Sequence, residues 1–153
     1  MTWGEFAKAA PEIAGFGAAR FAEIKVSMLA TVRPDGWPRL HPFEPILADG
    51  HLFLFTYRTP PKVRDLREDG RYSLHSTVTE AEGDLAEFSV RGVAKPVEDD
   101  ELSDVAWAAV EGKGWQPGGR LIAWELLVDE ASAIEWIQGK SRARRWQAQQ
   151  SQR

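Results

Sequence analysis

The chain has 153 residues, a length at which one hydrophobic core is the usual arrangement. Hydrophobic residues make up 43% and charged residues 27% of the sequence, a composition that argues against disorder. The sequence has no cysteine, which excludes disulfide bonds, zinc–thiolate sites and cysteine nucleophiles and fits a reducing compartment. No apolar run approaches the ~20 residues that a membrane-spanning helix needs, so we expect a cytoplasmic protein.

The net charge of −4 is unevenly distributed along the chain. Residues 139–153 carry five basic side chains and no acidic one, whereas residues 1–138 carry 14 basic and 23 acidic side chains. An acidic body argues against a general nucleic-acid-binding surface. Only the basic C-terminal segment leaves that function open.

The first third of the chain predicts helices followed by strands. Thr2 and Glu5 have the spacing of a capping box and Pro11 is a typical first helical residue, so we expect helical pieces over residues 3–23. Short β-prone runs separated by turn residues then predict a three-stranded meander over residues 26–33, 37–47 and 51–57.

The middle of the chain predicts a short helix. Thr59 is expected to cap this helix, with Pro60 as its first residue and Asp69-Gly70 as its end. Apolar spacing predicts a second amphipathic helix over residues 99–110. The remaining elements that we expect are strands over residues 71–78, 85–97, 121–128 and 131–136, an acidic turn at 80–84 and a loop at 112–119.

About seven strands with a few short helices predict a mainly β fold. Antiparallel strands of this number hide their edges best in a closed or partly closed barrel. We therefore expect one barrel domain over residues 1–138, with a helical N-terminal segment, and a basic tail over 139–153 that could be flexible.

Residues 56–64 concentrate several features of an anion site. A helix N-terminus carries free backbone N–H groups and partial positive charge, and Arg58, Lys62 and Arg64 could surround an anion placed there. Pro60 and Pro61 remove two of the N–H groups that such a site would use, so side chains would have to compensate. On these features alone, a solvated surface helix that starts with proline remains an equal alternative.

A resemblance favours the anion site. The sequence resembles the pyridoxamine 5'-phosphate oxidase-like superfamily, also called the FMN-binding split barrels, over roughly residues 20–138. The resemblance lies in residues 28–36, 38–42, 52–56, 62–66, 71–75 and 88–92.

The resemblance implies a split barrel of antiparallel strands that forms a homodimer. It implies FMN, or alternatively the deazaflavin coenzyme F-420, bound between the two subunits. It also implies that a threonine at the end of the third strand and a lysine six residues later contact the cofactor phosphate. Thr56 and Lys62 have this spacing, and Arg58 and Arg64 would be additional contacts.

The same resemblance places part of the second strand along the flavin ring. This part runs from Arg39 to Phe43, and its candidate cofactor contacts are Arg39, Leu40 and His41. The chain departs from true pyridoxamine phosphate oxidases, which have an arginine and a lysine about five apart on this strand and a serine–arginine pair before the phosphate lysine. We therefore do not expect oxidation of a vitamin B6 phosphate. The Lys-x-Arg-Asp-Leu pattern is closer to flavin or deazaflavin reductases of the same superfamily.

Several further side chains are candidates for the site. His41 is a weak candidate for a catalytic proton donor, because only histidine titrates near neutral pH unperturbed; alternatively it is hydrogen-bonded at a strand edge. His75 could reach the partner subunit's flavin or simply point outward. Trp115 and Trp146 are each candidates to cover a cofactor. The histidines are scattered without carboxylates at metal-ligand spacing, so we expect no metal site.

These features together predict an oxidoreductase that uses FMN or a deazaflavin to move hydride to or from a small organic substrate. No Rossmann, P-loop or hydrolase motif competes with this interpretation. One alternative is a protein of the same fold that binds or carries the cofactor without turnover. A less favoured alternative is a nucleic-acid-binding β-barrel that uses the basic tail.

Overall fold

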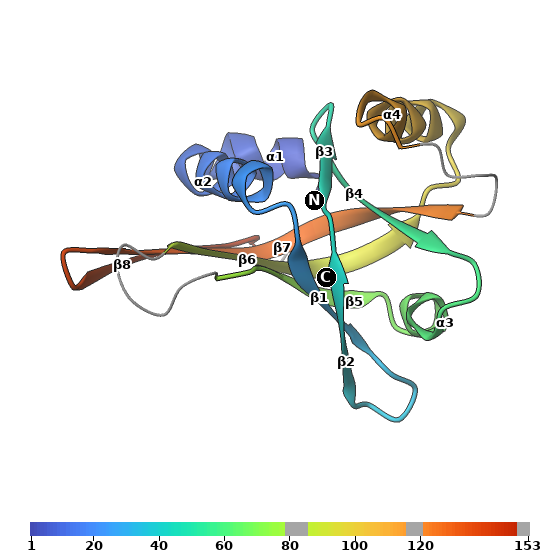
Figure 1. The fold of residues 1–153 in the computed structure, drawn as a ribbon, viewed down its shortest axis with the longest axis horizontal. Coiled ribbons are helices and arrows are strands. Elements are labelled where there is room, and N and C mark those ends of the chain that lie inside the picture. The colour runs from blue at the N-terminus through green and yellow to red at the C-terminus, as the bar shows by residue number, and fades with distance from the viewer. Residues whose placement is uncertain (79–85, 116–120, 150–153) are drawn as a thin grey trace.

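In the computed structural model, the described part of the chain forms one curved sheet of eight antiparallel strands (Figure 1). The structure describes residues 1–78, 86–115 and 121–149. The strand order is β2-β1-β5-β6-β7-β4-β3, and β8 pairs with β7. The strands are β1 (Ser27–Val32), β2 (Pro38–Phe43), β3 (Ile46–Ala48), β4 (His51–Tyr57), β5 (Arg71–Ser76), β6 (Ala86–Pro96), β7 (Leu121–Ile137) and β8 (Lys140–Gln147). This sheet confirms the predicted split-barrel fold.

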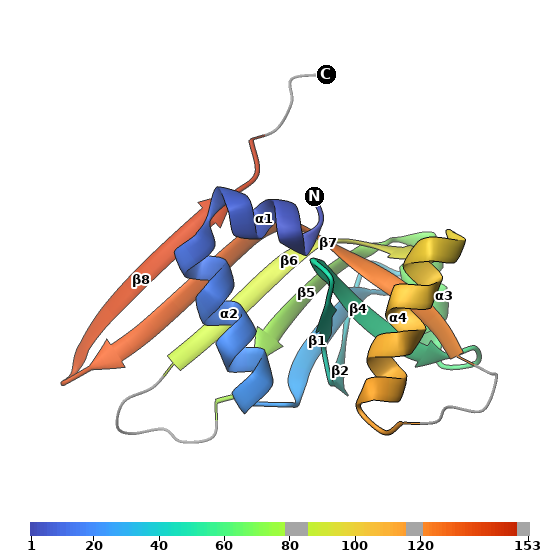
Figure 2. The ribbon, with the colours of Figure 1, turned by 90° about the horizontal axis from the view of Figure 1, so that it is seen from above.

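Within these residues, four helices accompany the sheet: α1 (Trp3–Ala9), α2 (Pro11–Glu23), α3 (Pro61–Glu68) and α4 (Asp100–Gly112). Helices α1 and α2 lie over β6, β7 and β8, and α4 lies beside β3 and β4 (Figure 2). Helix α3 packs against β1. In the described residues, no helix is both long and apolar enough to cross a membrane.

Alternating strand residues build the core on the helix-covered face of the sheet. A larger cluster under α1 and α2 includes the fully buried side chains of Phe6, Phe88 and Trp124. A smaller cluster under α4 joins Phe53 and Phe55 of β4 to the buried side of the helix. The N-terminal prediction is confirmed, since Thr2 and Glu5 form a reciprocal capping box at α1.

Two predicted boundaries in the first half of the chain are wrong. The single strand expected over 37–47 is two strands, β2 and β3, with Glu44 and Pro45 between them, and Pro45 cannot donate a ladder hydrogen bond. Helix α3 begins at Pro61, one residue later than expected, and its N-cap is Pro60. No side chain caps it, so the predicted cap by Thr59 is also wrong.

The C-terminal part differs more from the expectation. The two strands expected around residues 129 and 130 are one 17-residue strand, β7, and Asp129 lies at a shift of register opposite Arg91 and Gly92. This shift is a β-bulge rather than a turn. Residues 140–147 were expected in a polar tail, yet they form β8 and pair with β7 from Glu130 to Ile137. The expected acidic turn at 80–84 and half of the loop expected at 112–119 lie outside the described residues.

Candidate functional site

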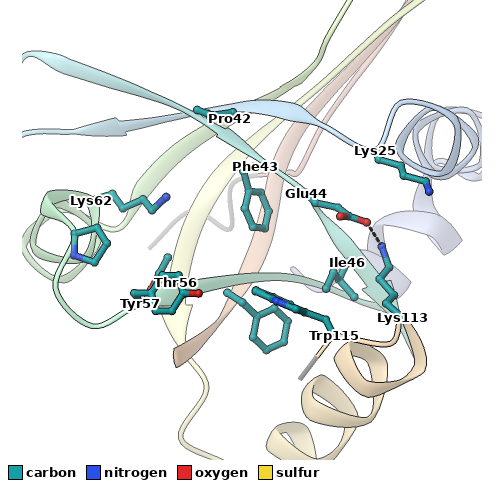
Figure 3. Close-up of a pocket in the computed structure, with 12 residues that line it drawn as sticks. Lys25, Pro42, Phe43, Glu44, Ile46, Thr56, Tyr57, Lys62, Lys113 and Trp115 are labelled. Carbon is teal, nitrogen blue, oxygen red and sulfur yellow. Dashed lines mark hydrogen bonds and ion pairs between the residues drawn. The ribbon is translucent and has the colours of Figure 1, made fainter. Parts of the chain in front are cut away.

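A hollow of about 740 Å³, here called the main cavity, opens beside the two end strands of the sheet (Figure 3). It is bordered by the strands β2, β3 and β4 and by the start of α3. Lys113 and Trp115, which follow α4, and the link between α2 and β1 complete its border. Its lining residues are Lys25, Pro42, Phe43, Glu44, Ile46, Phe55, Thr56, Tyr57, Pro60, Lys62, Lys113 and Trp115. The cavity therefore gathers segments that are far apart in the sequence.

Aromatic side chains form the walls in the middle of the main cavity. Phe43 comes from the end of β2 and Phe55 from β4. The rings of Phe55 and Trp115 meet edge to face, with their centroids 6.5 Å apart. Phe55 also packs on Trp107 of α4 at 5.3 Å, which anchors this wall to the smaller core cluster. Flat apolar walls of this kind suit a planar conjugated molecule.

Lys62 and Thr56 lie together at one end of the main cavity. Lys62 is the second residue of α3, and its partial burial lowers the pKa of its ammonium group from the ordinary lysine value. Thr56 ends the buried run of β4, and its Oγ1 accepts a 2.9 Å hydrogen bond from Nε1 of Trp124. That bond holds the Thr56 hydroxyl oxygen in place. Because Thr56 is the acceptor, its hydroxyl hydrogen is not used in this bond. The structure thus brings together the two residues predicted to contact a phosphate.

The opposite end of the main cavity also carries cations. Lys113 follows α4, and its Nζ lies 2.5 Å from Oε1 of Glu44, in the link between β2 and β3. Lys25, in the link between α2 and β1, lines the same end (Figure 3). Phe43 lies in the strand segment predicted to run along the flavin ring, whereas Lys25, Glu44 and Lys113 were not predicted from the sequence. No local pattern marks them, because their proximity depends on the packing of three separate links.

The arginines predicted to join the phosphate site point elsewhere. Arg58 and Arg64 line a separate groove of about 530 Å³. Arg39, which was predicted to lie along the flavin ring, lines the same groove together with Arg67 and Glu68, and Pro60 borders both the groove and the main cavity. We call it the arginine groove. Residues two apart on a helix point in different directions, so Lys62 and Arg64 cannot both face one cavity. The structure does not bring the four predicted phosphate contacts into one site.

A buried carboxylate ties α3 to the sheet. Asp65 is fully buried, and its Oδ2 accepts hydrogen bonds from Oγ1 of Thr31 at 3.0 Å and from Nε of Arg39 at 2.7 Å. Its Oδ1 is buried without a hydrogen-bond partner among the described residues. Arg39 is thus held by Asp65 at the border of the arginine groove, and it does not line the main cavity.

The other two predicted residues of β2 differ in exposure. Leu40 is 62% exposed and borders neither the main cavity nor the arginine groove. His41 is half-buried, and its Nε2 has no partner within the part of the chain that the structure describes. Burial, followed by the charges of Lys62 and Arg39, lowers the pKa of His41. This shift favours the neutral imidazole over the imidazolium, and His41 too lies outside the lining of both hollows.

His75 and Trp146 lie away from the main cavity. His75 Nδ1 is 2.6 Å from the backbone oxygen of Ser76, and its Nε2 is 3.6 Å from a carboxylate oxygen of Glu87. Trp146 packs its ring on Phe6 at 4.8 Å and so belongs to the core under α1. Of the two tryptophans predicted to cover a cofactor, only Trp115 lines the cavity. Within residues 1–78, 86–115 and 121–149, no group of three acidic or histidine side chains could hold a metal ion.

The curved antiparallel sheet with its cavity at the open end is the architecture of a split-barrel protein. The sequence matches the family model for pyridoxamine 5'-phosphate oxidase over residues 17–134. Because the match covers most of the chain, the chain belongs to this family. Comparison with curated proteins gives no match.

Several solved structures share this fold. A heme-binding protein from Mycobacterium smegmatis is 25% identical with a TM-score of 0.67, and the match covers 86% of this chain and 57% of that protein. A NimC/NimA family protein from Clostridium acetobutylicum is 17% identical with a TM-score of 0.61, covering 88% and 94%. HutZ, a heme storage protein from Vibrio cholerae, is 21% identical with a TM-score of 0.59, covering 78% and 89%. The chain thus spans little more than half the length of the Mycobacterium protein.

Proposed function

We propose that the main cavity binds a flavin-type cofactor, FMN or a deazaflavin such as F-420, and that the protein is an oxidoreductase acting on a small organic molecule. One observation carries the proposal: Thr56 and Lys62 meet at one end of a cavity whose middle is walled by aromatic rings. The resemblance to flavin and deazaflavin reductases supports the same choice of cofactor.

The lining residues fit a planar molecule with a phosphate. Lys62 offers a partly buried ammonium group to the phosphate, and the hydroxyl of Thr56 offers a hydrogen-bond donor. Phe43, Phe55 and Trp115 offer apolar surface to a ring system, and a hollow of about 740 Å³ is within the range of cofactor sites. Arg58 and Arg64 stay in the proposal as contacts for any charged extension that crosses Pro60 into the arginine groove.

A bound flavin would supply the hydride chemistry, and the protein would supply binding, orientation and exclusion of water. Lys62 holds the phosphate end, the aromatic walls fix the plane of the ring, and Tyr57, which is 57% exposed, stands at the cavity mouth. We also propose that the chain forms a homodimer with the cofactor between subunits. The exposed Leu40 on the end strand β2 and the exposed Trp37 before it give such an interface apolar surface.

Haem binding is a second candidate, favoured by the likeness to the Mycobacterium smegmatis heme-binding protein. Haem iron in proteins is usually held by histidine, cysteine, methionine or tyrosine. Among the described residues that line the main cavity, Tyr57 alone belongs to these types. The lining therefore suits a flavin better than haem. Titration with hemin distinguishes the two, because a sharp Soret band at one haem per chain would favour haem.

Replacing Lys62 with methionine tests the phosphate end. Loss of one charge-assisted contact to a phosphate is expected to cost ~1.5–3 kcal/mol, so FMN affinity should fall more than tenfold. Fluorescence titration of the wild-type and variant proteins with FMN measures the change. Arg64→Met is the matched control, since Arg64 borders the arginine groove, and it should change FMN affinity by less than about threefold. Unchanged FMN affinity in Lys62→Met would remove the phosphate assignment.

A further inference from the structure

The main cavity has a second cationic end that the proposed phosphate contact does not use. Lys25 and Lys113 lie there, across the aromatic walls from Lys62, as Figure 3 shows. Both lysines come from links between elements, Lys25 after α2 and Lys113 directly after α4. Both belong to the lining of the same end of the cavity, so both contribute positive charge to it.

The charges at this end do not cancel. Glu44 pairs with Lys113 at 2.5 Å, and the two side chains are 45% and 44% exposed. Lys25 takes part in no ion pair within the described residues. Two ammonium groups and one carboxylate leave this end with one net positive charge. An anionic group of a ligand is therefore favoured here over a neutral or cationic one.

We propose that this end, formed by Lys25, Lys113 and Glu44, receives the carboxylate group of an anionic conjugated substrate. The inference rests on the proposed function, because it assumes that the cofactor phosphate occupies the Lys62 end. The aromatic walls between the two ends then hold the flavin ring and the conjugated part of the substrate. Lysine ammonium groups suit a single carboxylate, since they act as point charges without a fixed two-pronged geometry.

Glu44 has a specific part in this arrangement. In the structure it holds Lys113 as a substrate carboxylate would, so it competes with the substrate for that ammonium group. A substrate carboxylate has to displace Glu44 from Lys113 or share the lysine with it. Glu44 consequently lowers the affinity for anions, and its neutral replacement should raise that affinity.

The test compares two probes that differ in charge at nearly equal shape. Calorimetric titration with trans-cinnamate and with trans-cinnamamide measures both affinities, for the protein as purified and for the protein saturated with FMN. The variants are Lys25→Met, Lys113→Met and Glu44→Gln. Lys95→Met is the matched control, because Lys95 is an exposed lysine of β6 that does not line the cavity.

The wild-type protein should bind cinnamate more tightly than cinnamamide. Lys25→Met and Lys113→Met should each weaken cinnamate binding about fivefold, as expected for partly exposed charge pairs, and should leave cinnamamide binding within twofold. Glu44→Gln should strengthen cinnamate binding, and Lys95→Met should change neither probe. Equal affinity for the two probes in the wild-type protein, including no binding of either, overturns the inference, as does an equal loss for both probes in the lysine variants.

FMN titration of the same variants separates this inference from the proposed function. Lys25→Met should bind FMN as the wild type does. If Lys25→Met loses FMN affinity and keeps riboflavin affinity, the phosphate lies at the Lys25 end, and the inference fails while flavin binding stands. If FMN binds neither the wild-type protein nor any variant and cinnamate discrimination persists, the proposed function fails and the anion-binding end remains.

Discussion

Replacement of Gly92 with alanine is expected to destabilise the protein by at least ~3 kcal/mol, or to prevent folding. Gly92 lies in β6 beside the bulge of β7, where the backbones of the two strands come unusually close. A Cβ atom at this position would lie 1.9 Å from the carbonyl oxygen of Leu127 and 3.1 Å from the backbone nitrogen of Asp129. These atoms belong to the backbone of a long central strand, so no side-chain rotation can relieve the overlap.

The same substitution at Gly15 is the control. Gly15 lies inside α2, and an added Cβ there would meet no atom within 4 Å. Because alanine is a better helix former than glycine, Gly15→Ala should raise the free energy of unfolding by up to ~1 kcal/mol. Urea unfolding followed by circular dichroism measures both changes. A Gly92→Ala protein as stable as the wild type would show that the bulge is not where the structure has it.

Replacement of Asp65 with alanine should lower the free energy of unfolding by about 2–3 kcal/mol. The change removes the acceptor of both the buried Thr31 hydroxyl and the Arg39 guanidinium. Thr31 is 1% exposed and loses a partner that water cannot easily replace. Arg39 is about a quarter exposed, so water replaces part of the interaction that its guanidinium loses. We therefore place the stability cost of Asp65→Ala at or below the lower end of the range for breaking a buried ion pair.

Two further variants serve as comparisons for Asp65→Ala. Asp65→Asn keeps the shape and an acceptor oxygen for Thr31 but loses the charge, so its stability should lie between those of Asp65→Ala and the wild type. Glu23→Ala breaks an ion pair in which the Glu23 side chain is 67% exposed, and should cost at most ~0.5 kcal/mol. Thermal and urea unfolding of all three measure the series. An Asp65→Ala cost no larger than that of Glu23→Ala would contradict the buried link between α3 and β1.

Sequence patterns predict those elements of the fold that neighbouring residues specify by themselves. The capping box at Thr2, the β-prone apolar run of β4 and the spacing of α4 each specify an element through neighbouring residues, and the structure has each of them. The bulge at Asp129 and the strand β8 depend on partners far along the chain. Asp129-Glu130 has the composition of a turn, and only the register with β6 makes it a bulge.

The candidate site likewise contains residues that local spacing predicts and residues that only the folded chain brings together. The spacing of Thr56 and Lys62 predicts two residues that do line one cavity. Arg58 and Arg64 were grouped with them by closeness in sequence, yet the helical geometry of α3 turns Arg64 toward a different groove. Lys25, Glu44 and Lys113 carry no sequence signal at all, because three links of the chain meet only after the sheet has curved and α4 has packed beside β3.

A comparison of FMN with riboflavin tests the central claim most directly, since the two ligands share the ring and differ in the phosphate. Fluorescence and absorbance titration of the wild-type protein should show saturable binding of FMN, with riboflavin bound at least tenfold more weakly. This difference should largely vanish in Lys62→Met. Equal affinity for FMN and riboflavin in the wild-type protein, or no saturable binding of FMN, would contradict a flavin phosphate site at Thr56 and Lys62.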